Sequence, residues 1–371
     1  MSGTIQTEKI GKLGFGYMRL PRKNGKFDYE QINKMADAFI ASGGNYFDTA
    51  YVYTGAEVAF RESVVKRYPR ESYLIATKLP LEDADTIGKL DERFKTSLER
   101  LGVDYVDFYL LHGIDAKASR EAEALGTWDY MADLKAKGLV RHIGFSFHAP
   151  PEELEEILSK HPDSEFVQLQ LNYQEWDDPV AQARRMYEIA RKYEIPIIVM
   201  EPLLGGLLAS VDSPIADLLR GAKQEASLAS WALRFVAQLD GVFVTLSGMS
   251  DYEQLADNVA TYANLTPLSE DEQAILDKAV GIINSIPRIG CTSCRYCIEG
   301  CPSKINIPDL IDVYNSHLVH NTMTNLRGSY SWVTSTSGKA SGCTACGACE
   351  KACPQNIKII DTMAKISELF D

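Results

Sequence analysis

The cysteines constrain this chain more than any other feature. All eight lie between residues 291 and 353, in two runs of identical spacing, and the residues before them contain none. Each run has the pattern C-x2-C-x2-C-x3-C-P, which is typical of bacterial proteins that bind [4Fe–4S] clusters. The two runs consist of Cys291, Cys294, Cys297 and Cys301, and of Cys343, Cys346, Cys349 and Cys353.

In this pattern the first three cysteines of a run bind one cluster, and the fourth, before the proline, binds the other. We therefore predict two [4Fe–4S] clusters. Zinc sites and disulfides are the alternatives, but zinc sites use pairs of cysteines, and disulfide frameworks are typical of short secreted chains. The predicted ligand sets are Cys291, Cys294, Cys297 and Cys353 for one cluster, and Cys343, Cys346, Cys349 and Cys301 for the other.

The segments beside the cysteine runs have helical periodicity. Residues 307–319 and 360–369 place apolar side chains at the spacing of one helix face. We predict that residues 286–371 form a small, mainly helical ferredoxin-like domain for metal binding and electron transfer. Residues 1–285 are then a separate domain.

The first 285 residues alternate short apolar runs with longer amphipathic segments. Eight strands alternating with helices over about 250 residues is typical of a (β/α)8 barrel. A doubly wound sheet is the alternative, but the turn after the first strand lacks the GxGxxG pattern of such folds. The candidate strands are residues 13–16, 45–47, 73–77, 106–111, 142–145, 166–169, 197–200 and 242–245. The candidate helices include residues 28–42, 86–101, 122–138, 151–161, 179–193 and 228–239.

The charge balance argues against nucleic acids and anionic membranes as partners. The chain has 38 basic and 51 acidic side chains, a net charge of −13, and acidic surfaces repel both. The longest apolar stretch, residues 195–211, contains a glutamate and two prolines, so it is not expected to span a membrane. The N-terminal residues lack the apolar segment of a secretory signal. We therefore expect a cytoplasmic protein.

Six short motifs follow one another along the chain. They are GFGYMRLP at residues 14–21, FDTAYVY at 47–53, ATK at 76–78, YLLH at 109–112, IGFS at 143–146, and LSGM at 246–249 leading to Asn258. In this order they resemble the aldo-keto reductase superfamily, and the whole chain resembles its branch with a C-terminal ferredoxin-type domain. Each motif alone is weak, but the ordered set covers nearly all of the chain. The resemblance implies a TIM barrel and an oxidoreductase that reduces a carbonyl or oxidises an alcohol.

The resemblance implies a catalytic tetrad of Asp48, Tyr53, Lys78 and His112. Each residue lies at or just past the C-terminal end of a predicted strand, where barrel enzymes place their chemistry. Tyr53 would donate the proton to the alkoxide that forms when hydride reaches a carbonyl. Free tyrosine has a pKa of about 10, so Lys78 is expected to lower the pKa of Tyr53. Asp48 would hold Lys78, and His112 would orient the carbonyl.

The resemblance also implies a nicotinamide cofactor across the barrel mouth. Ser146 and Gln168 match the residues that hold its carboxamide, and residues 201–206 match its pyrophosphate loop. His148 is a further candidate for the pocket. The predicted cofactor contacts are Ser146, Gln168, Met200, Pro202, Leu203, Gly205, Gly248 and Asn258.

Three departures from the family leave the identity of the cofactor open. Phe147 stands where the family has an asparagine, and Met200 where it has an aromatic ring. Residues 248–254 contain no Lys or Arg, and Asp251 and Glu253 would repel an adenosine 2′-phosphate, which carries about two charges. NAD(H) is therefore as acceptable as NADP(H), and a flavin is an alternative.

A mismatch in electron number leaves two further functions open. Nicotinamides transfer two electrons as hydride, whereas a [4Fe–4S] cluster transfers one at a time. The first alternative is a ferredoxin-linked reductase with a flavin in the barrel, which would have a ferredoxin or another electron carrier as partner beside its small carbonyl or alcohol substrate. The second is a non-catalytic electron-transfer or redox-sensing protein. The complete tetrad favours an enzyme.

Overall fold

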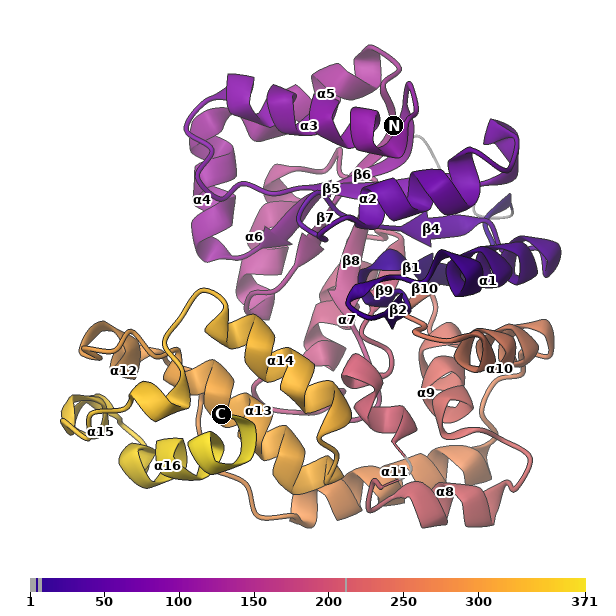
Figure 1. Cartoon of the computed structure of the whole chain (residues 1–371). Coiled ribbons are helices and arrows are strands. Elements are labelled where there is room, and N and C mark those ends of the chain that lie inside the picture. The colour runs from indigo at the N-terminus through magenta and orange to yellow at the C-terminus, as the bar shows by residue number, and fades with distance from the viewer. Residues whose placement is uncertain (1–4, 6–8, 211) are drawn as a thin grey trace. The chain divides into compact units, whose positions relative to one another are not determined.

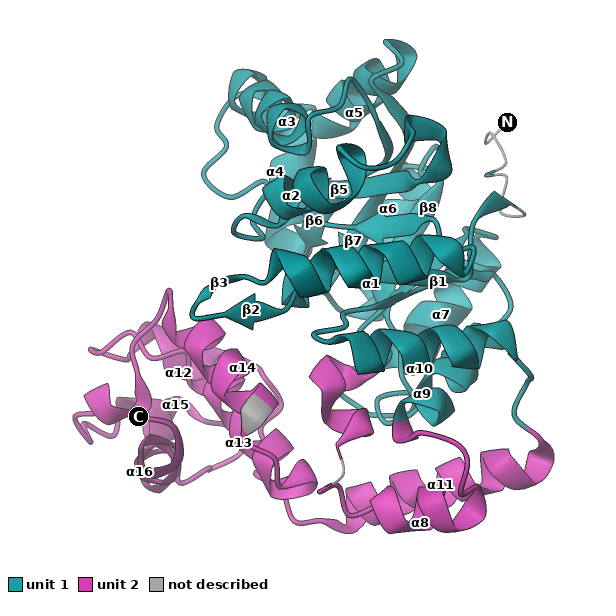
Figure 2. Ribbon diagram, turned by 45° about the vertical axis from the view of Figure 1, so that its right-hand side comes forward, with its two compact units in different colours: residues 1–202, 229–268 teal, residues 203–228, 269–371 magenta. Residues whose placement is uncertain are grey.

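The computed structural model describes residue 5, residues 9–210 and residues 212–371. The chain forms two compact units, shown in Figure 2: unit 1 is Met1–Pro202 with Ala229–Leu268, and unit 2 is Leu203–Leu228 with Ser269–Asp371. These units group residues by packing. The domain boundary predicted between residues 285 and 286 stays a prediction.

Unit 1 contains a closed barrel of parallel strands (Figure 1). Neighbours in the barrel follow the order of the chain, and the first strand closes it by pairing with both the second and the last barrel strand. The predicted (β/α)8 barrel is confirmed, and each predicted strand overlaps an observed one. The barrel strands are β1 (Leu13–Gly16), β4 (Tyr46–Asp48), β5 (Leu74–Leu79), β6 (Val106–Ile114), β7 (Val140–Phe147), β8 (Phe166–Gln170), β9 (Ile197–Met200) and β10 (Val242–Ser247).

Helices follow the barrel strands along the chain. The segment predicted as one helix over residues 122–138 is divided in the structure, because Gly126 has a φ of 69° and ends one helix before the next begins. The helices are α1 (Tyr29–Ala41), α2 (Ala56–Phe60), α3 (Ile87–Leu101), α4 (Ala116–Leu125), α5 (Thr127–Ala136), α6 (Pro151–Lys160), α7 (Ala183–Lys192), α9 (Leu228–Ala237) and α10 (Tyr252–Ala263). The shorter elements are η2 (Tyr17–Arg19), β2 (Arg22–Lys23), β3 (Lys26–Phe27), η3 (Arg61–Val65) and η4 (Arg70–Ser72).

Glycines admit large side chains to the barrel interior. A Cβ on Gly14 would lie 2.7 Å from Leu246 Cδ2, and one on Gly144 would lie 2.4 Å from the carbonyl oxygen of Phe166. The space is filled by a buried cluster that includes Tyr46, Phe108 and Phe166. This tight packing holds the strands that carry the site at their C-terminal ends.

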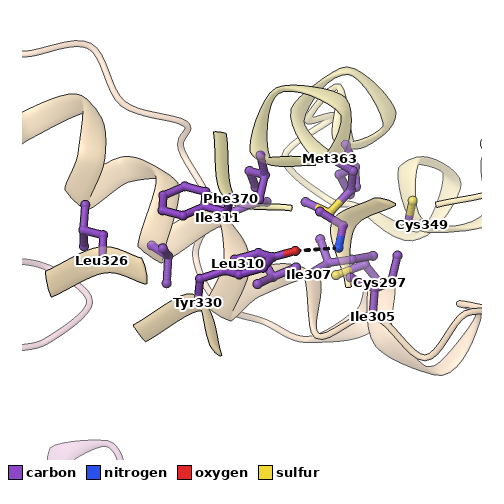
Figure 3. Close-up of a cluster of buried hydrophobic side chains, with 14 of the residues drawn as sticks. Cys297, Ile305, Ile307, Leu310, Ile311, Leu326, Tyr330, Cys349, Met363 and Phe370 are labelled. Atoms are coloured by element: carbon purple, nitrogen blue, oxygen red, sulfur yellow. Dashed lines mark hydrogen bonds between the residues drawn. The ribbon is translucent and has the colours of Figure 1, made fainter. Parts of the chain in front are cut away.

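Unit 2 is helical, as predicted for the C-terminal segment. Its core is shown in Figure 3, where the Tyr330 hydroxyl accepts a hydrogen bond from the Ala340 N–H at 3.0 Å. The Tyr330 ring stacks on Phe370 with 5.2 Å between ring centres. The elements of unit 2 are η5 (Leu204–Ala209), α8 (Ala216–Ala222), α11 (Glu270–Ser285), α12 (Tyr296–Glu299), α13 (Ile307–His320), α14 (Thr324–Thr334), η6 (Ala340–Gly342), α15 (Ala348–Ala352) and α16 (Ile359–Phe370). In the described residues, no helix has the length and apolar character needed to span a membrane.

Each cysteine run lies in one copy of a structural unit that occurs twice in the C-terminal segment. A shift of 52 residues, from Cys291 to Cys343, superposes the start of α12 on that of α15 and the start of α13 on that of α16. The backbone repeats as well, because matched residues share the left-handed φ region. The matched pairs are Ser293 and Ala345 (53° and 55°), Arg295 and Gly347 (65° and 75°), and Lys304 and Asn356 (52° and 53°).

Candidate active site and cluster cavities

Lys78 is a buried cation near the C-terminal end of β5. Its side chain is 1% exposed, and Nζ donates to Asp48 Oδ1 at 2.5 Å and to the Thr49 carbonyl at 2.8 Å. Burial alone would lower the pKa of Lys78, but the Asp48 carboxylate holds that pKa above its ordinary value. The neighbouring strands β4 and β5 therefore place a fixed positive charge inside the barrel.

Tyr53 lies in the segment between β4 and α2, with its ring beside this charge. Lys78 Nζ is 5.0 Å from the centre of the Tyr53 ring. Burial raises the pKa of Tyr53 above its ordinary value, while the charge of Lys78 acts in the opposite direction. The predicted lowering by Lys78 is present as a contribution, but burial outweighs it, so the net shift is upward.

His112, in β6, contacts the edge of this group. Its ring centre is 5.8 Å from that of Tyr53, with the two planes nearly perpendicular at 82°. Burial, with smaller contributions from the charge of Lys78 and from the nearby His148, lowers the pKa of His112 to about 3. His112 is therefore neutral at pH 7, with one ring nitrogen as donor and the other as acceptor. His148 itself is exposed, one residue past the end of β7.

The structure thus brings the four predicted tetrad residues together at the C-terminal ends of β4, β5 and β6. A phenol beside a buried ammonium can give up a proton, because the ammonium stabilises the phenolate that remains. A neutral imidazole at the same place can donate a hydrogen bond to a carbonyl oxygen.

Ser146 and Gln168 are paired across the neighbouring strands β7 and β8. Ser146 Oγ accepts from the Gly113 N–H at 2.8 Å, so its hydroxyl proton can go to another acceptor. Gln168 Nε2 contacts Met200 Sδ at 3.5 Å, and Gln168 Oε1 is buried with no hydrogen-bond partner among the described residues. A hydroxyl donor beside an unpaired amide oxygen fits a carboxamide, which has one acceptor and one NH2 donor.

The predicted adenosine end of the cofactor site has cations that lie outside residues 248–254. The Arg19 side chain packs over Gly248, where its Cδ would be 3.4 Å from an added Cβ, and it forms an ion pair with Glu201 at 3.4 Å. Lys34 Nζ lies 3.7 Å from the centre of the Tyr252 ring. Neither cation was predicted from the sequence, because both lie far along the chain from residues 248–254, although Arg19 belongs to the GFGYMRLP motif.

The remaining predicted contacts lie in both units. Asn258 is buried and donates to Ser247 Oγ at 2.9 Å, and Pro202 is the last residue of the first segment of unit 1. Leu203 and Gly205 belong to unit 2, and Gly205 has a φ of 63°. Their roles stay predictions.

The cysteines of unit 2 line two cavities of about 320 and 330 Å³. Each cavity is lined by three cysteines of one run and the fourth cysteine of the other, and all eight thiols are free of disulfides. In the described part of the chain, no three His, Cys, Asp or Glu side chains converge as ligands of a single metal ion. Cavity 1 contains Cys291, Cys294, Cys297 and Cys353, and cavity 2 contains Cys301, Cys343, Cys346 and Cys349. Four thiols around a cavity fit the ligand set of a [4Fe–4S] cluster.

Two family models match the chain. The model of the Aldo/keto reductase family matches residues 12–280, and that of the 4Fe-4S dicluster domain matches residues 290–358. An aldo-keto reductase of Mycolicibacterium vanbaalenii is 30% identical over 256 residues, which are 68% of this chain and 85% of the relative. Aldo-keto reductase str7 of Strobilurus tenacellus is 26% identical over 320 residues, 74% of this chain and 91% of the relative.

Solved structures agree with this match. The holo form of an aldo-keto reductase from Bacillus halodurans is 25% identical, with a TM-score of 0.57 over 72% of this chain and 91% of its own. An aldo-keto reductase from Klebsiella pneumoniae, solved in complex with NADPH, is 21% identical, with a TM-score of 0.58 over 72% of this chain and 90% of its own. The similarity to the Klebsiella pneumoniae structure shows that the two chains share the fold.

Proposed function

Because this chain belongs to the aldo/keto reductase family, and is an oxidoreductase with a C-terminal 4Fe-4S dicluster domain, we propose that it reduces a small carbonyl compound to an alcohol, or catalyses the reverse reaction. The observation that carries the proposal is the buried Lys78–Asp48 pair beside the Tyr53 ring. An ion pair this deeply buried is expensive to desolvate, and a proton donor that needs a neighbouring charge gives a reason for keeping it.

A nicotinamide held by Ser146 and Gln168 would provide the hydride for the carbonyl carbon. Tyr53 supplies the proton to the carbonyl oxygen. The phenol is protonated at pH 7, since the ordinary pKa of tyrosine is about 10 and burial raises that of Tyr53 above it. After the transfer, Lys78 stabilises the phenolate, and Asp48 holds the ammonium in place. His112, neutral at this pH, donates a hydrogen bond to the carbonyl oxygen and orients it for both transfers.

Ser146 and Gln168 support a nicotinamide as the hydride source. The Ser146 hydroxyl would donate to the carboxamide oxygen, and the unpaired Gln168 Oε1 would accept from its NH2 group. Two bonds from neighbouring strands would fix the orientation of the carboxamide. Oxidation of NADH or NADPH by aldehydes or ketones, with protein prepared without oxygen, tests the proposal. Flavin absorption bands and no such oxidation would replace it with the flavin-linked alternative.

In unit 2 we propose two [4Fe–4S] clusters, one held by the four thiols of each cavity. Bound there, each cluster would accept one electron at a time. A partner that transfers single electrons, such as a ferredoxin, matches that chemistry. A small carbonyl or alcohol is the proposed substrate of the barrel.

NADH is expected to bind at least as tightly as NADPH at low ionic strength. Asp251 and Glu253 are negative, and Arg19 is already paired with Glu201, so a 2′-phosphate gains little attraction. Fluorescence titration with both nucleotides measures this. Arg19→Met is the informative variant: an equal loss for both nucleotides would indicate a contact to the shared diphosphate. A clear preference for NADPH that Arg19→Met removes would contradict the prediction.

Protonation of His112 is expected to cause no loss of activity between about pH 8 and pH 5. The pKa of His112 is lowered from 6.5 to about 3, so the ring stays neutral throughout this range. The measurement is the pH profile of kcat for carbonyl reduction, compared with that of His112→Gln. The charge of His148 acts on His112, so His148→Asn is the control. A fall in rate near pH 6.5 that persists in His148→Asn but disappears in His112→Gln would refute the assignment.

A further inference from the structure

The two cysteine cavities are built from matched positions of the repeated unit. With the 52-residue shift, every residue that lines cavity 1 has its counterpart in the lining of cavity 2, which contains Pro302 in addition. Cysteines match cysteines, Thr292 matches Thr344, and Ile307 matches Ile359. The volumes, about 320 and 330 Å³, are nearly equal as well. Any difference between the groups bound in the cavities therefore comes from the few positions that differ.

The most consequential difference is Arg295 in cavity 1, which corresponds to Gly347 in cavity 2. Apart from the thiols, Arg295 is the one ionisable side chain among the described residues that line either cavity. A second difference adds to it: Gln355 in cavity 1 replaces Ser303 of cavity 2, whose hydroxyl is bonded to the Gly342 carbonyl at 2.6 Å. Cavity 1 thus has a cation and an amide donor that cavity 2 lacks.

Arg295 is held in place by an acidic residue of α13. Its Nη1 and Nη2 lie 3.2 and 3.4 Å from the two carboxylate oxygens of Asp309, in a bidentate arrangement. Arg295 lines cavity 1, whereas Asp309 does not. Its counterpart in the second half is Asp361, which does not line cavity 2. The two halves therefore share the carboxylate and differ in the arginine.

Adding an electron to an iron–sulfur cluster makes the cluster more negative, so a nearby cation favours the reduced form and raises the reduction potential. Resting on the two clusters of the proposed function, we propose that Arg295 makes the cluster of cavity 1 the one with the higher potential. A single electron that reaches this domain then resides on the cluster of cavity 1. If it arrives on the cluster of cavity 2, it passes to the oxidised cluster of cavity 1, and no proton or atom is transferred. Arg295 is a tuning residue and not a ligand.

The repeat supplies matched variants. Arg295→Gly gives cavity 1 the residue of cavity 2, and Gly347→Arg does the reverse. The second change has room, since no atom lies within 4 Å of a Cβ at Gly347. It places an arginine at a φ of 75°, in the left-handed region that side chains rarely adopt, as Arg295 itself does at 65°. Asp361 stands where Asp309 binds the arginine, so the new guanidinium has a partner available. Arg295→Lys keeps the charge and is the control.

The experiment is a potentiometric titration of the full protein, followed by low-temperature EPR, with iron and sulfide measured on each sample. The wild type is expected to give two one-electron waves. Arg295→Gly should lower the upper wave by about 59 mV, a tenfold change in the partition of the electron, and leave the lower wave in place. Gly347→Arg should raise the lower wave by a similar amount, and Arg295→Lys should keep the upper wave within about a threefold change of partition.

A single wave in the wild type would overturn the inference, as would an Arg295→Gly protein whose upper wave does not move or whose lower wave moves instead. If the Arg295→Gly protein loses iron, the titration of Gly347→Arg is the deciding measurement. A lower wave that does not move in Gly347→Arg overturns the inference. Wild-type protein with neither iron nor sulfide would instead end the cluster assignment itself, which is a separate failure.

Discussion

Replacement of Tyr53 by phenylalanine is expected to lower the rate of carbonyl reduction by about 10²–10⁴-fold, the usual cost of losing a positioned general acid. The change removes one hydroxyl and keeps the ring beside Lys78 and the edge contact with His112, so the barrel should fold normally. The measurement is kcat with NADH or NADPH and a reactive carbonyl, with iron content and circular dichroism on the same sample. No cysteine is touched, so iron content should not change.

Tyr51→Phe is the matched control. Tyr51 precedes Tyr53 by two residues in the same segment, but its ring lies under the guanidinium of Arg100, 4.5 Å from the ring centre, and not beside Lys78. It should keep most of the activity. A Tyr53→Phe enzyme as active as Tyr51→Phe would show that the proton comes from another group, and would move the protein toward the electron-transfer alternative.

Lys78→Met is expected to be similarly damaging by another route. Without the ammonium, nothing offsets the burial that raises the pKa of Tyr53, and Asp48 is left as a buried carboxylate without its partner. The double variant with Tyr53→Phe should be little worse than the worse single variant, because the two residues act through one proton. Full multiplication of the two losses would mean that they act independently. Thermal unfolding of Lys78→Met separates lost chemistry from lost stability.

The barrel was predictable because buried parallel strands are continuous apolar runs separated by amphipathic helices. Each predicted strand overlaps an observed one for that reason. The division of residues 122–138 into α4 and α5 was missed, because amphipathic periodicity does not show that Gly126 adopts the left-handed φ that ends α4. The packing of residues 203–228 with the cysteine segment was also missed, since no local pattern encodes which distant segment an apolar loop contacts.

The candidate site divides in the same way. Motif order predicted the four residues that the structure brings together. The net pKa of Tyr53 was not predictable in this way, because it depends on how much protein surrounds the ring, and no motif contains that quantity. Arg19 in η2 and Lys34 in α1 contact the loop of residues 248–254, although both lie far from it along the chain. The cysteines were the reverse case. A local spacing rule predicted two crossed sets of four, and the structure lines each cavity with one of these sets.

Wild-type protein prepared without oxygen is expected to contain about eight irons and eight acid-labile sulfides per chain, the content of two cubane clusters. Two zinc ions and no sulfide would end the assignment. Cys353→Ala should remove the cluster of cavity 1 and leave about four irons, and Cys301→Ala should do the same for cavity 2. Single variants do not show which of the two clusters each cysteine binds, since the loss of either cluster halves the iron content.

Pairs of substitutions separate crossed from uncrossed ligation. Cys294 and Cys353 line the same cavity although they belong to different runs, whereas Cys294 and Cys301 share a run but line different cavities. Crossed ligation predicts that Cys294→Ala with Cys353→Ala keeps about four irons, and that Cys294→Ala with Cys301→Ala keeps almost none. If each run bound its own cluster, the two results would be exchanged. Iron and sulfide analysis therefore decides the ligand sets without any assay of activity.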